Sequence, residues 1–205
     1  MARLELQRLE VGPWPMNCYL LRCLVSGELA IVDPGSDAQT ILAAAGNATV
    51  RFILLTHGHP DHIGALESVR QATGAPAAVH PADAERFDVQ ADILLRDGME
   101  VRVGEGSVRI AHVPGHTPGS VCLRLTGRVV VGDAIFPGGP GYTASPQDLT
   151  QSLTSLGRTV FTWPDETELY PGHGGHTTVQ AERAAFSRFV MADRPADLCG
   201  DVSWA

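Results

Sequence analysis

The sequence of 205 residues contains no lysine, and all 15 of its basic residues are arginines. The acidic residues number 23, so the formal net charge is −8. No run of basic residues occurs anywhere in the chain. Surfaces that bind nucleic acid or anionic lipid need clustered positive charge. We therefore expect neither a nucleic acid nor a membrane surface among the partners of this protein.

Long apolar segments are also missing. No apolar run approaches the roughly 18 residues that a membrane-spanning helix needs. The first eight residues carry charges every few positions, unlike a signal peptide. Cysteines are few and widely spaced, and in a chain of this size they are typical of reduced core residues. They are Cys18, Cys23, Cys122 and Cys199. Together these features predict a cytoplasmic protein.

The overall composition is that of a globular protein with a substantial core. Hydrophobic residues make up 44% and charged residues 19% of the chain, and the mean hydropathy is +0.02. The length is that of one domain. We assign residues 1–192 to a single domain and predict that residues 193–205 form a loosely held C-terminal tail.

The apolar pattern predicts strands and helices in both halves of the chain. Strands are expected over residues 4–11, 18–25, 29–32, 51–55, 101–103, 108–110, 121–125 and 129–131. Helices are expected after a cap at Ser36 or Asp37 up to Gly46, around residues 63–69, and over residues 146–156 and 178–190. Because each half mixes both kinds of element, we predict an α/β fold in which two sheets pack face to face with helices outside.

Residues 56–62 read Thr-His-Gly-His-Pro-Asp-His and contain three of the chain's 8 histidines. The segment follows an apolar strand, and Pro60 suits the first turn of a helix, so it is a strand-to-helix loop from which ligands project. His57 and His59 can point the same way, whereas Asp61 and His62 leave the helix start in a neighbouring direction. This spacing favours metal binding. A histidine-rich loop without a ligand is the alternative.

Three further candidate ligands stand in similar loops. His116 lies in Pro-Gly-His-Thr-Pro-Gly-Ser, Asp133 follows an apolar strand, and His173 lies in Tyr-Pro-Gly-His-Gly. Glycine lets each loop approach closely, and proline fixes the path of the chain. The recurrence of this pattern argues against a ligand-free histidine loop.

The order of these motifs resembles that of the metallo-β-lactamase superfamily. The motifs are a His-x-His-x-Asp-His segment, a Gly-His-Thr-Pro-Gly-Ser loop, a Gly-Asp pair after a strand and a Pro-Gly-His-Gly loop. Within this superfamily, the chain is most similar to the glyoxalase II (hydroxyacylglutathione hydrolase) branch and its small relatives, from about Asn17 to Thr178. The resemblance implies a four-layer αβ/βα sandwich, the metallo-β-lactamase fold, with a two-metal site at one edge of the paired sheets.

The resemblance also implies which residues hold the metals. The first metal would be bound by His57, His59 and His116, the second by Asp61, His62 and His173, and Asp133 would bridge them. An aspartate at the bridge position argues against the antibiotic-hydrolysing branch that holds its second zinc with a thiolate. Imidazole and carboxylate ligands suit two divalent ions, zinc in the first place, with iron or manganese as alternatives.

The chemistry implied is hydrolysis of a small thioester or ester. Two cations about 3.5–4 Å apart lower the pKa of a bridging water, so that hydroxide attacks a carbonyl near neutral pH. The metals also stabilise the developing oxyanion. Asp61 is expected to act as the catalytic residue that orients the hydroxide, besides binding metal. The absence of a Gly-x-Ser-x-Gly motif agrees with this interpretation.

Two departures from glyoxalase II concern the substrate. The loop over residues 136–146 differs from the usual one, and we expect no C-terminal helical domain to supply basic residues for glutathione. The acyl group and the oligomeric state stay open. One alternative is a mononuclear-iron persulfide dioxygenase, in which only His57, His116 and Asp133 bind metal. Another is a metal-binding module without catalytic activity.

Other residues have weaker claims to a role in the site. Asp33 and Thr56 are candidates to orient the ligand imidazoles, although Asp33 can equally stabilise a turn. Tyr142 is a candidate to contact the substrate through its hydroxyl group. Structural roles are predicted for the remaining polar and aromatic candidates, which are His80, His112, His176, Phe161, Trp163 and Tyr170.

Overall fold

The computed structural model describes residues 3–13 and 15–204, and most of its strands form two six-stranded sheets. The first sheet has the order β1 (Leu4–Val11), β2 (Met16–Cys23), β3 (Leu29–Val32), β4 (Val50–Leu54), β5 (Ala77–Val79) and β6 (Ile93–Leu94). The second has the order β14 (Thr177–Thr178), β13 (Glu168–Pro171), β10 (Arg128–Gly132), β9 (Val121–Arg124), β8 (Gly106–His112) and β7 (Glu100–Val103). A small ribbon pairs β11 (Ile135–Phe136) with β12 (Gly139–Pro140).

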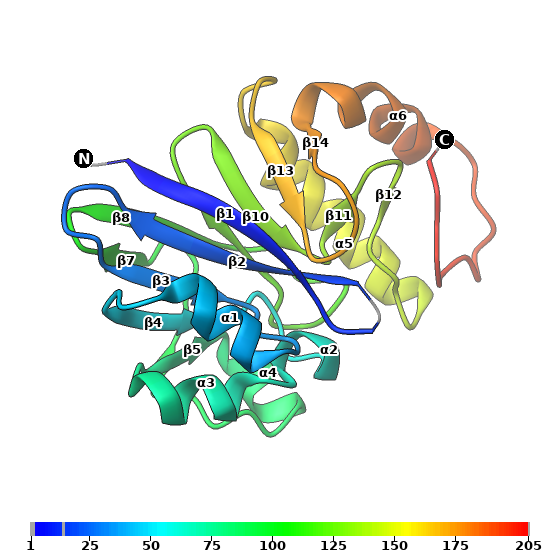
Figure 1. Ribbon diagram of the computed structural model, residues 1–205. Helices are drawn as coiled ribbons and strands as arrows, with labels where there is room; N and C mark the ends of the chain where they lie inside the picture. Colours follow the sequence, from blue (N-terminus) through cyan, green and yellow to red (C-terminus); the bar gives the residue numbers. More distant parts are fainter. Residues whose placement is uncertain (1–2, 14, 205) are drawn as a thin grey trace.

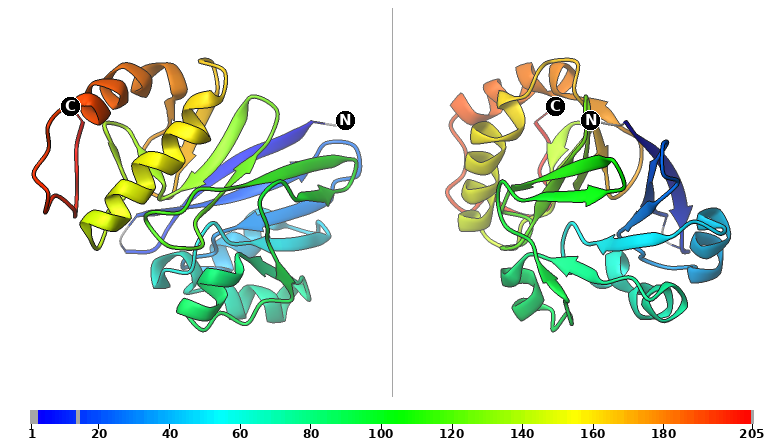
Figure 2. Two further views of the ribbon diagram at one scale, coloured as in Figure 1. Left: turned by 180° about the vertical axis from the view of Figure 1, so that it is seen from behind. Right: turned by 90° about the vertical axis from the view of Figure 1, so that its left-hand side faces the viewer.

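Helices cover the outer faces of both sheets (Figures 1 and 2). The first half contains α1 (Ala38–Ala45), α2 (Pro60–Ile63), α3 (Leu66–Thr73) and α4 (Pro81–Arg86). The second contains α5 (Pro146–Arg158), a 3₁₀ turn (Val160–Thr162) and α6 (Val179–Met191). Within the described part of the chain, no helix has the length and apolar character to cross a membrane.

Three apolar cores separate the four layers. In β2, Cys18 and Leu20 face α1 and α3, whereas Tyr19 and Leu21 face the second sheet. In the second sheet, Val130 faces the first, and its neighbours in β10 face α5 and α6. Strands with two buried faces are continuously apolar rather than alternating. The predicted four-layer αβ/βα sandwich is therefore confirmed.

Two local predictions differ from the structure. The helix expected around residues 63–69 is divided into α2 and α3, because the amide of Ala65 donates to the carbonyl of Pro34 (2.9 Å) and draws the chain onto that turn. Asp37 occupies the position before α1 but makes no side-chain cap. Its carboxylate instead accepts a hydrogen bond from the amide of Gly12 (2.7 Å).

The chain after α6 returns to the body of the molecule. Trp204 is buried, and its indole donates to the carboxylate of Glu182 (3.0 Å). Its backbone amide donates to the carbonyl of Gly138 (3.0 Å), and Gly200 pairs with Thr143 as an isolated bridge. Trp204 and Gly200 thus contact the body of the molecule, and the assignment of residues 193–205 to a tail stays a prediction. The assignment of residues 1–192 to one domain stays a prediction.

Two backbone hydrogen bonds join the first sheet to the second at one edge of the sandwich. The amide of Asn17 donates to the carbonyl of Gly172 (2.7 Å), and the amide of Val121 donates to the carbonyl of Thr56 (2.9 Å). This edge holds the carboxyl ends of the parallel strands β3 and β4 and of the parallel pair β10 and β13. In parallel sheets, ligand sites form outside such strand ends.

Candidate metal centre

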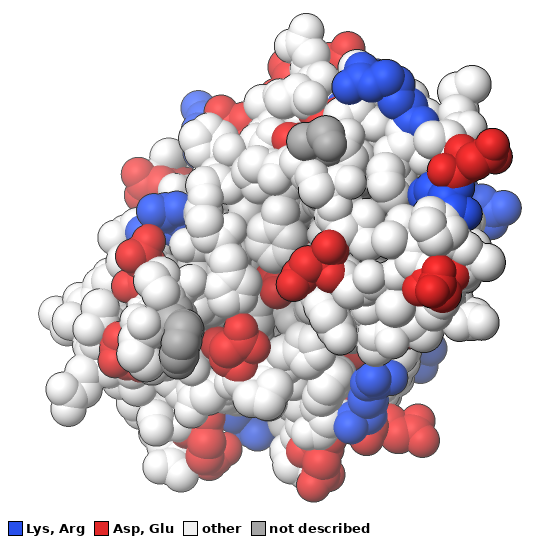
Figure 3. Space-filling model, turned by 90° about the vertical axis from the view of Figure 1, so that its right-hand side faces the viewer, with Lys and Arg blue, Asp and Glu red and all other residues white. Residues whose placement is uncertain are grey.

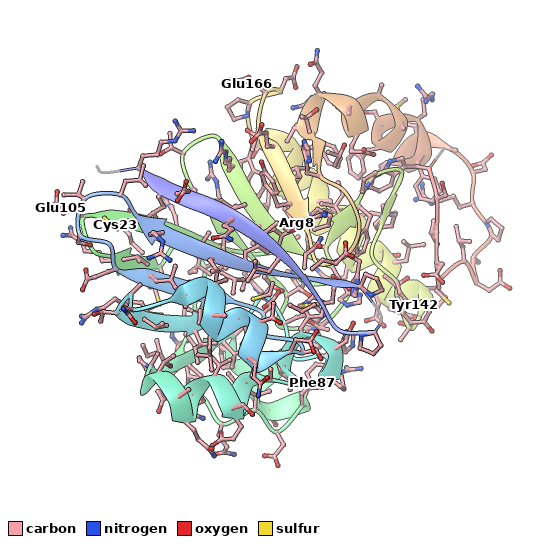
Figure 4. The ribbon with its side chains drawn as sticks, viewed as in Figure 1. Arg8, Cys23, Phe87, Glu105, Tyr142 and Glu166 are labelled. Atoms are coloured by element: carbon pink, nitrogen blue, oxygen red, sulfur yellow. The ribbon has the colours of Figure 1, made fainter. Side chains whose placement is uncertain are left out.

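All seven predicted ligands meet at this edge, which Tyr142 and Phe87 flank in Figure 4. The loop after β4 carries His57 and His59, and α2 carries Asp61 and His62. The other three residues follow β8, β10 and β13 and are His116, Asp133 and His173. Pro60 is the first residue of α2, as its fixed backbone angle favours.

His57, His59 and His116 form what we call the three-histidine group. Nε2 of His116 lies 2.9 Å from Nδ1 of His59 and 3.3 Å from Nε2 of His57. One ring nitrogen of each residue lies within 4.8 Å of the other two. Three imidazole nitrogens directed at one point are the arrangement in which proteins hold a catalytic cation with an open position.

Asp61, His62 and His173 form the second cluster, which we call the mixed group. Oδ2 of Asp61 lies 3.1 Å from Nε2 of His173, and one potential ligand atom from each residue lies within 4.8 Å of the other two. His62 is fully buried, whereas the side chain of Asp61 is 50% exposed. The mixed group is thus open to solvent on its Asp61 side.

Asp133 lies between the two groups. Its carboxylate oxygens are 3.3 Å from Nε2 of His62, 3.8 Å from Nε2 of His116 and 3.7 Å from Nε2 of His173. Gly172 makes room for it, because a Cβ atom there would lie 2.1 Å from the Asp133 carboxylate. This carboxylate can therefore reach a cation in either group.

The donor atoms fit a pair of cations. Nε2 of His62 and Oδ1 of Asp133 are buried without a hydrogen-bond partner among the described residues. Buried polar atoms of proteins are nearly always satisfied. A cation bound between the residues of the mixed group and Asp133 would satisfy both atoms.

The electrostatics around His57 and His59 favour neutral imidazoles. Burial, followed by the neighbouring His62 and His116, lowers the pKa of His57 well below its ordinary value. Burial and His116 likewise lower the pKa of His59. The neutral form is the one that binds a metal ion.

The mixed group carries opposite charges. Burial acts to lower the pKa of His62, but the charge of the nearby Asp133 carboxylate and the hydrogen bond that His62 donates to Asp33 outweigh it and raise this pKa to about 10. The hydrogen bond between His173 and Asp61 lowers the pKa of Asp61 to about 2 and raises that of His173. A metal bound here would therefore displace protons from the histidines.

Asp33 and Thr56 do contact the ligand residues. One oxygen of the buried Asp33 carboxylate accepts from Nδ1 of His62 (3.0 Å) and from the hydroxyl of Thr56 (2.5 Å). The Thr56 hydroxyl in turn lies 3.1 Å from Nδ1 of His57. Asp33 also accepts from the Thr56 amide, so it holds the turn and orients His62 at the same time. Such contacts fix the ring orientation of metal-binding histidines.

Sequence reasoning missed the backbone partners of two other ligands. Nδ1 of His116 donates to the carbonyl of Tyr142 (2.8 Å), and Nδ1 of His173 donates to the carbonyl of Pro15 (2.9 Å). Both carbonyls belong to segments far away in the sequence. Any residue type offers a carbonyl, so no sequence signal could have identified these two contacts.

Sequence reasoning also missed Asp83 in α4. It is fully buried and accepts three hydrogen bonds from the loops that carry the three-histidine group. Asp83 stands two residues after Pro81 in a short helix. An aspartate at such a position more often faces solvent, so the burial of Asp83 was not expected from the sequence. The sequence did not reveal which loops it would contact.

The residues with predicted structural roles lie outside the two groups. The rings of His80 and His112 stack on each other (centroids 4.0 Å apart), and the ring of His176 stacks on Tyr170 (5.4 Å). Phe161 and Trp163 belong to the core under α5 and α6, and Tyr170 packs against the core between the sheets. Tyr142 is 52% exposed, and its hydroxyl stays a candidate substrate contact.

Comparison with known proteins places the chain in a family. The profile of the metallo-beta-lactamase superfamily matches residues 11–173. A hydroxyacylglutathione hydrolase from Anaeromyxobacter dehalogenans is 40% identical over 156 residues, which cover 76% of this chain and 60% of that protein.

Solved structures agree with this result. The crystal structure of ETHE1 from Myxococcus xanthus superimposes with a TM-score of 0.79 at 30% identity, covering 87% of this chain and 81% of that one. The structure of TTHA1623 in a di-iron-bound form gives a TM-score of 0.72 at 30% identity, covering 86% and 96%. From its motifs, its fold and these similarities, the chain belongs to the metallo-β-lactamase superfamily.

Proposed function

We propose that this protein is a metal-dependent hydrolase of the glyoxalase II type that cleaves a small thioester or ester. The observation that carries the proposal is the position of Asp133 between two complete ligand groups. Each group offers three donor atoms, and the carboxylate between them is the group that two adjacent cations would share. All seven ligands are then those that the sequence analysis named.

Two divalent cations bound here would supply Lewis acidity and a water molecule activated as a nucleophile at neutral pH. Asp61 is the protein group available to orient that water, because its carboxylate is half exposed and the pKa of the carboxyl is lowered to about 2 by the hydrogen bond with His173. In hydrolysis of a thioester the water would add to the carbonyl carbon and the carbon–sulfur bond would break, with one water proton passing to the departing thiolate, so that the products would be a carboxylic acid and a thiol. The Asp61 carboxylate would accept a hydrogen bond from this water before it adds.

The ligand set supports zinc, with iron or manganese as alternatives. The donors are imidazoles and carboxylates, and none of the residues in the two groups is a cysteine. Such ligands bind several divalent ions, so geometry and supply decide among them. The similar protein TTHA1623 has been crystallised in a di-iron-bound form.

The charges around the site support a substrate other than a large anionic thioester. Figure 3 views the molecule from the side of the metal centre, and the arginines lie at the margins of this face, whereas acidic side chains lie nearer its centre. Arg183 is engaged with Asp165 (2.7 Å) and with the carbonyl of Phe161. The guanidinium of Arg194 stacks on the ring of Phe189. A small, weakly charged thioester fits these surroundings best. We also propose that the protein acts in the cytoplasm.

Two measurements on one preparation test the proposal. Metal analysis of protein purified without chelators or added metal should give two ions per chain, and a panel of thioesters should reveal hydrolysis that a chelator abolishes. A single tightly held iron, with oxygen consumed in the presence of a persulfide, would instead identify the dioxygenase. Two bound metals without turnover of any ester or thioester would identify a binding module.

A further inference from the structure

Asp83 connects the two loops that together form the three-histidine group. One oxygen of its carboxylate accepts from the amide of Gly58 (2.9 Å) and from the hydroxyl of Thr117 (2.8 Å). The other oxygen accepts from the amide of Gly119 (2.7 Å). Gly58 stands between His57 and His59, and Thr117 follows His116.

The space around this carboxylate is closely filled. A Cβ atom at Gly119 would lie 2.6 Å from the Asp83 carboxylate, and one at Gly58 would lie 2.4 Å from the ring of Phe87. Phe87 follows Asp83 by one helical turn, and its ring packs edge-on against His59 with centroids 5.1 Å apart. Asp83 in α4 and Phe87, which directly follows α4, therefore contact the loops that carry the three-histidine group.

The two buried carboxylates, Asp33 and Asp83, contact different parts of the metal centre. Asp33 contacts His62 of the mixed group directly and reaches His57 only through the hydroxyl of Thr56. The Asp83 carboxylate accepts hydrogen bonds from the two loops that carry the three-histidine group, at Gly58, Thr117 and Gly119. We therefore expect a change at Asp83 to act on the three-histidine group.

We propose that Asp83 is a positioning residue that holds the His59 and His116 loops together and so raises the metal affinity of the three-histidine group alone. The inference rests on the metal centre of the proposed function, but not on the reaction or the substrate. A metal site needs its ligands in fixed positions. Mutation of residues that hydrogen-bond metal ligands typically lowers metal affinity by about 10- to 100-fold.

The first test is a zinc titration of metal-free protein in competition with a chromophoric chelator. Asp83→Asn keeps the size of the side chain but directs an amide N–H at a donor on one of the two loops, so at least one hydrogen bond is lost. We expect the wild-type protein to bind two zinc ions, and Asp83→Asn to bind one with unchanged affinity and the other 10- to 100-fold more weakly.

Two background variants show which zinc ion is affected. In His116→Ala the three-histidine group is broken, so adding Asp83→Asn should change the affinity of the remaining zinc by less than about twofold. In His173→Ala the mixed group is broken, and the same addition should weaken the remaining zinc 10- to 100-fold. Equal effects in both backgrounds, or no effect in either, would overturn the proposal.

A matched control separates positioning from general destabilisation. Glu182 is also a buried carboxylate with three hydrogen bonds, from Thr177, Gly138 and Trp204. Glu182→Gln should lower the melting temperature as much as Asp83→Asn does but leave both zinc affinities unchanged. If Glu182→Gln weakens the same zinc to the same extent, the effect of Asp83 is one of stability and the proposal is wrong.

A milder pair of variants covers the case in which Asp83→Asn does not fold. Thr117→Val removes the hydroxyl that donates to Asp83, and Thr117→Ser retains it. We expect a smaller loss of affinity in the first variant and recovery in the second, and equal affinities in both would contradict the proposal. Since these readouts are metal affinities, a protein that binds two zinc ions but hydrolyses no thioester would disprove the proposed function and leave this inference intact.

Discussion

The two halves of the molecule contribute to the metal centre in different ways. The first half supplies four ligands from one stretch of six residues after β4, His57 to His62. The second half supplies one ligand from each of three separate loops. The two histidines among these ligands, His116 and His173, are oriented by distant backbone carbonyls. The first set is brought together by its closeness in the chain and is oriented by Asp33 and Asp83. The second set depends on how the strands of the second sheet are ordered. Changes in the second half should therefore test the packing of the whole centre.

The largest effect is expected at Asp133, where the two halves meet. Asp133→Ala should lose both metals and lower kcat/KM by more than about 1000-fold, because His62 keeps no carboxylate partner on that side. Breaking a buried pair by removing one partner costs about 3–5 kcal/mol. Asp133→Asn should fold better than Asp133→Ala while still losing most turnover. Metal analysis, thermal unfolding and kinetics on both variants check this prediction. A variant Asp133→Ala that retains two metals would contradict it.

Gly172 gives the next largest effect. In Gly172→Ala the new methyl group would lie 2.1 Å from the Asp133 carboxylate and 2.4 Å from the His62 ring. We expect zinc affinity to fall at least about 10-fold, measured by chelator competition. Gly175→Ala is the matched control, because nothing lies within 4 Å of a Cβ atom there. Similar zinc affinities for Gly172→Ala and Gly175→Ala would mean that the loops of the second half can shift without loss of metal binding.

A smaller effect concerns the substrate. The carboxylates of a glutathione thioester need fixed cationic partners, and this chain has no lysine. Remote binding energy raises kcat/KM only where the protein makes the remote contacts. We expect kcat/KM for lactoyl-glutathione to exceed that of a truncated thioester with the same acyl group by less than about 10-fold. A preference above about 1000-fold, about 4 kcal/mol, would mean that a glutathione site exists.

The smallest effect is expected at His176, three residues after His173. Its ring stacks on Tyr170 and lies outside both ligand groups. His176→Ala should change kcat/KM by less than 10-fold and leave the metal content unchanged, whereas His173→Ala should lose the metal of the mixed group. The reverse result would show that the ligand in the loop after β13 is assigned to the wrong histidine.

The difference between the halves also explains how far the sequence could be interpreted. The apolar pattern predicted two packed sheets with helices outside. The closely spaced histidines and the glycine- and proline-rich loops carried the family resemblance that implied the four-layer sandwich and the seven candidate ligands, which the structure brings to one place. Contacts that arise only from packing were not predictable. The carbonyls of Pro15 and Tyr142 carry no residue signature, and Asp83 finds its partners on loops that are 25 and 34–36 residues away in the sequence. The burial of Trp204 likewise involves a contact with Glu182, which lies 22 residues earlier in the first turn of α6.

The strand order has a consequence for synthesis on the ribosome. Strands β1 to β6 are consecutive in the chain and form the whole first sheet, so this sheet can assemble before the second half has been translated. The four ligands after β4 are then exposed early, but the last ligand, His173, follows β13. We therefore expect the nascent chain to pass through a stage that presents a histidine-rich loop without a closed metal site. Retention of both metals should begin only after translation has passed β13, because His173 belongs to the mixed group.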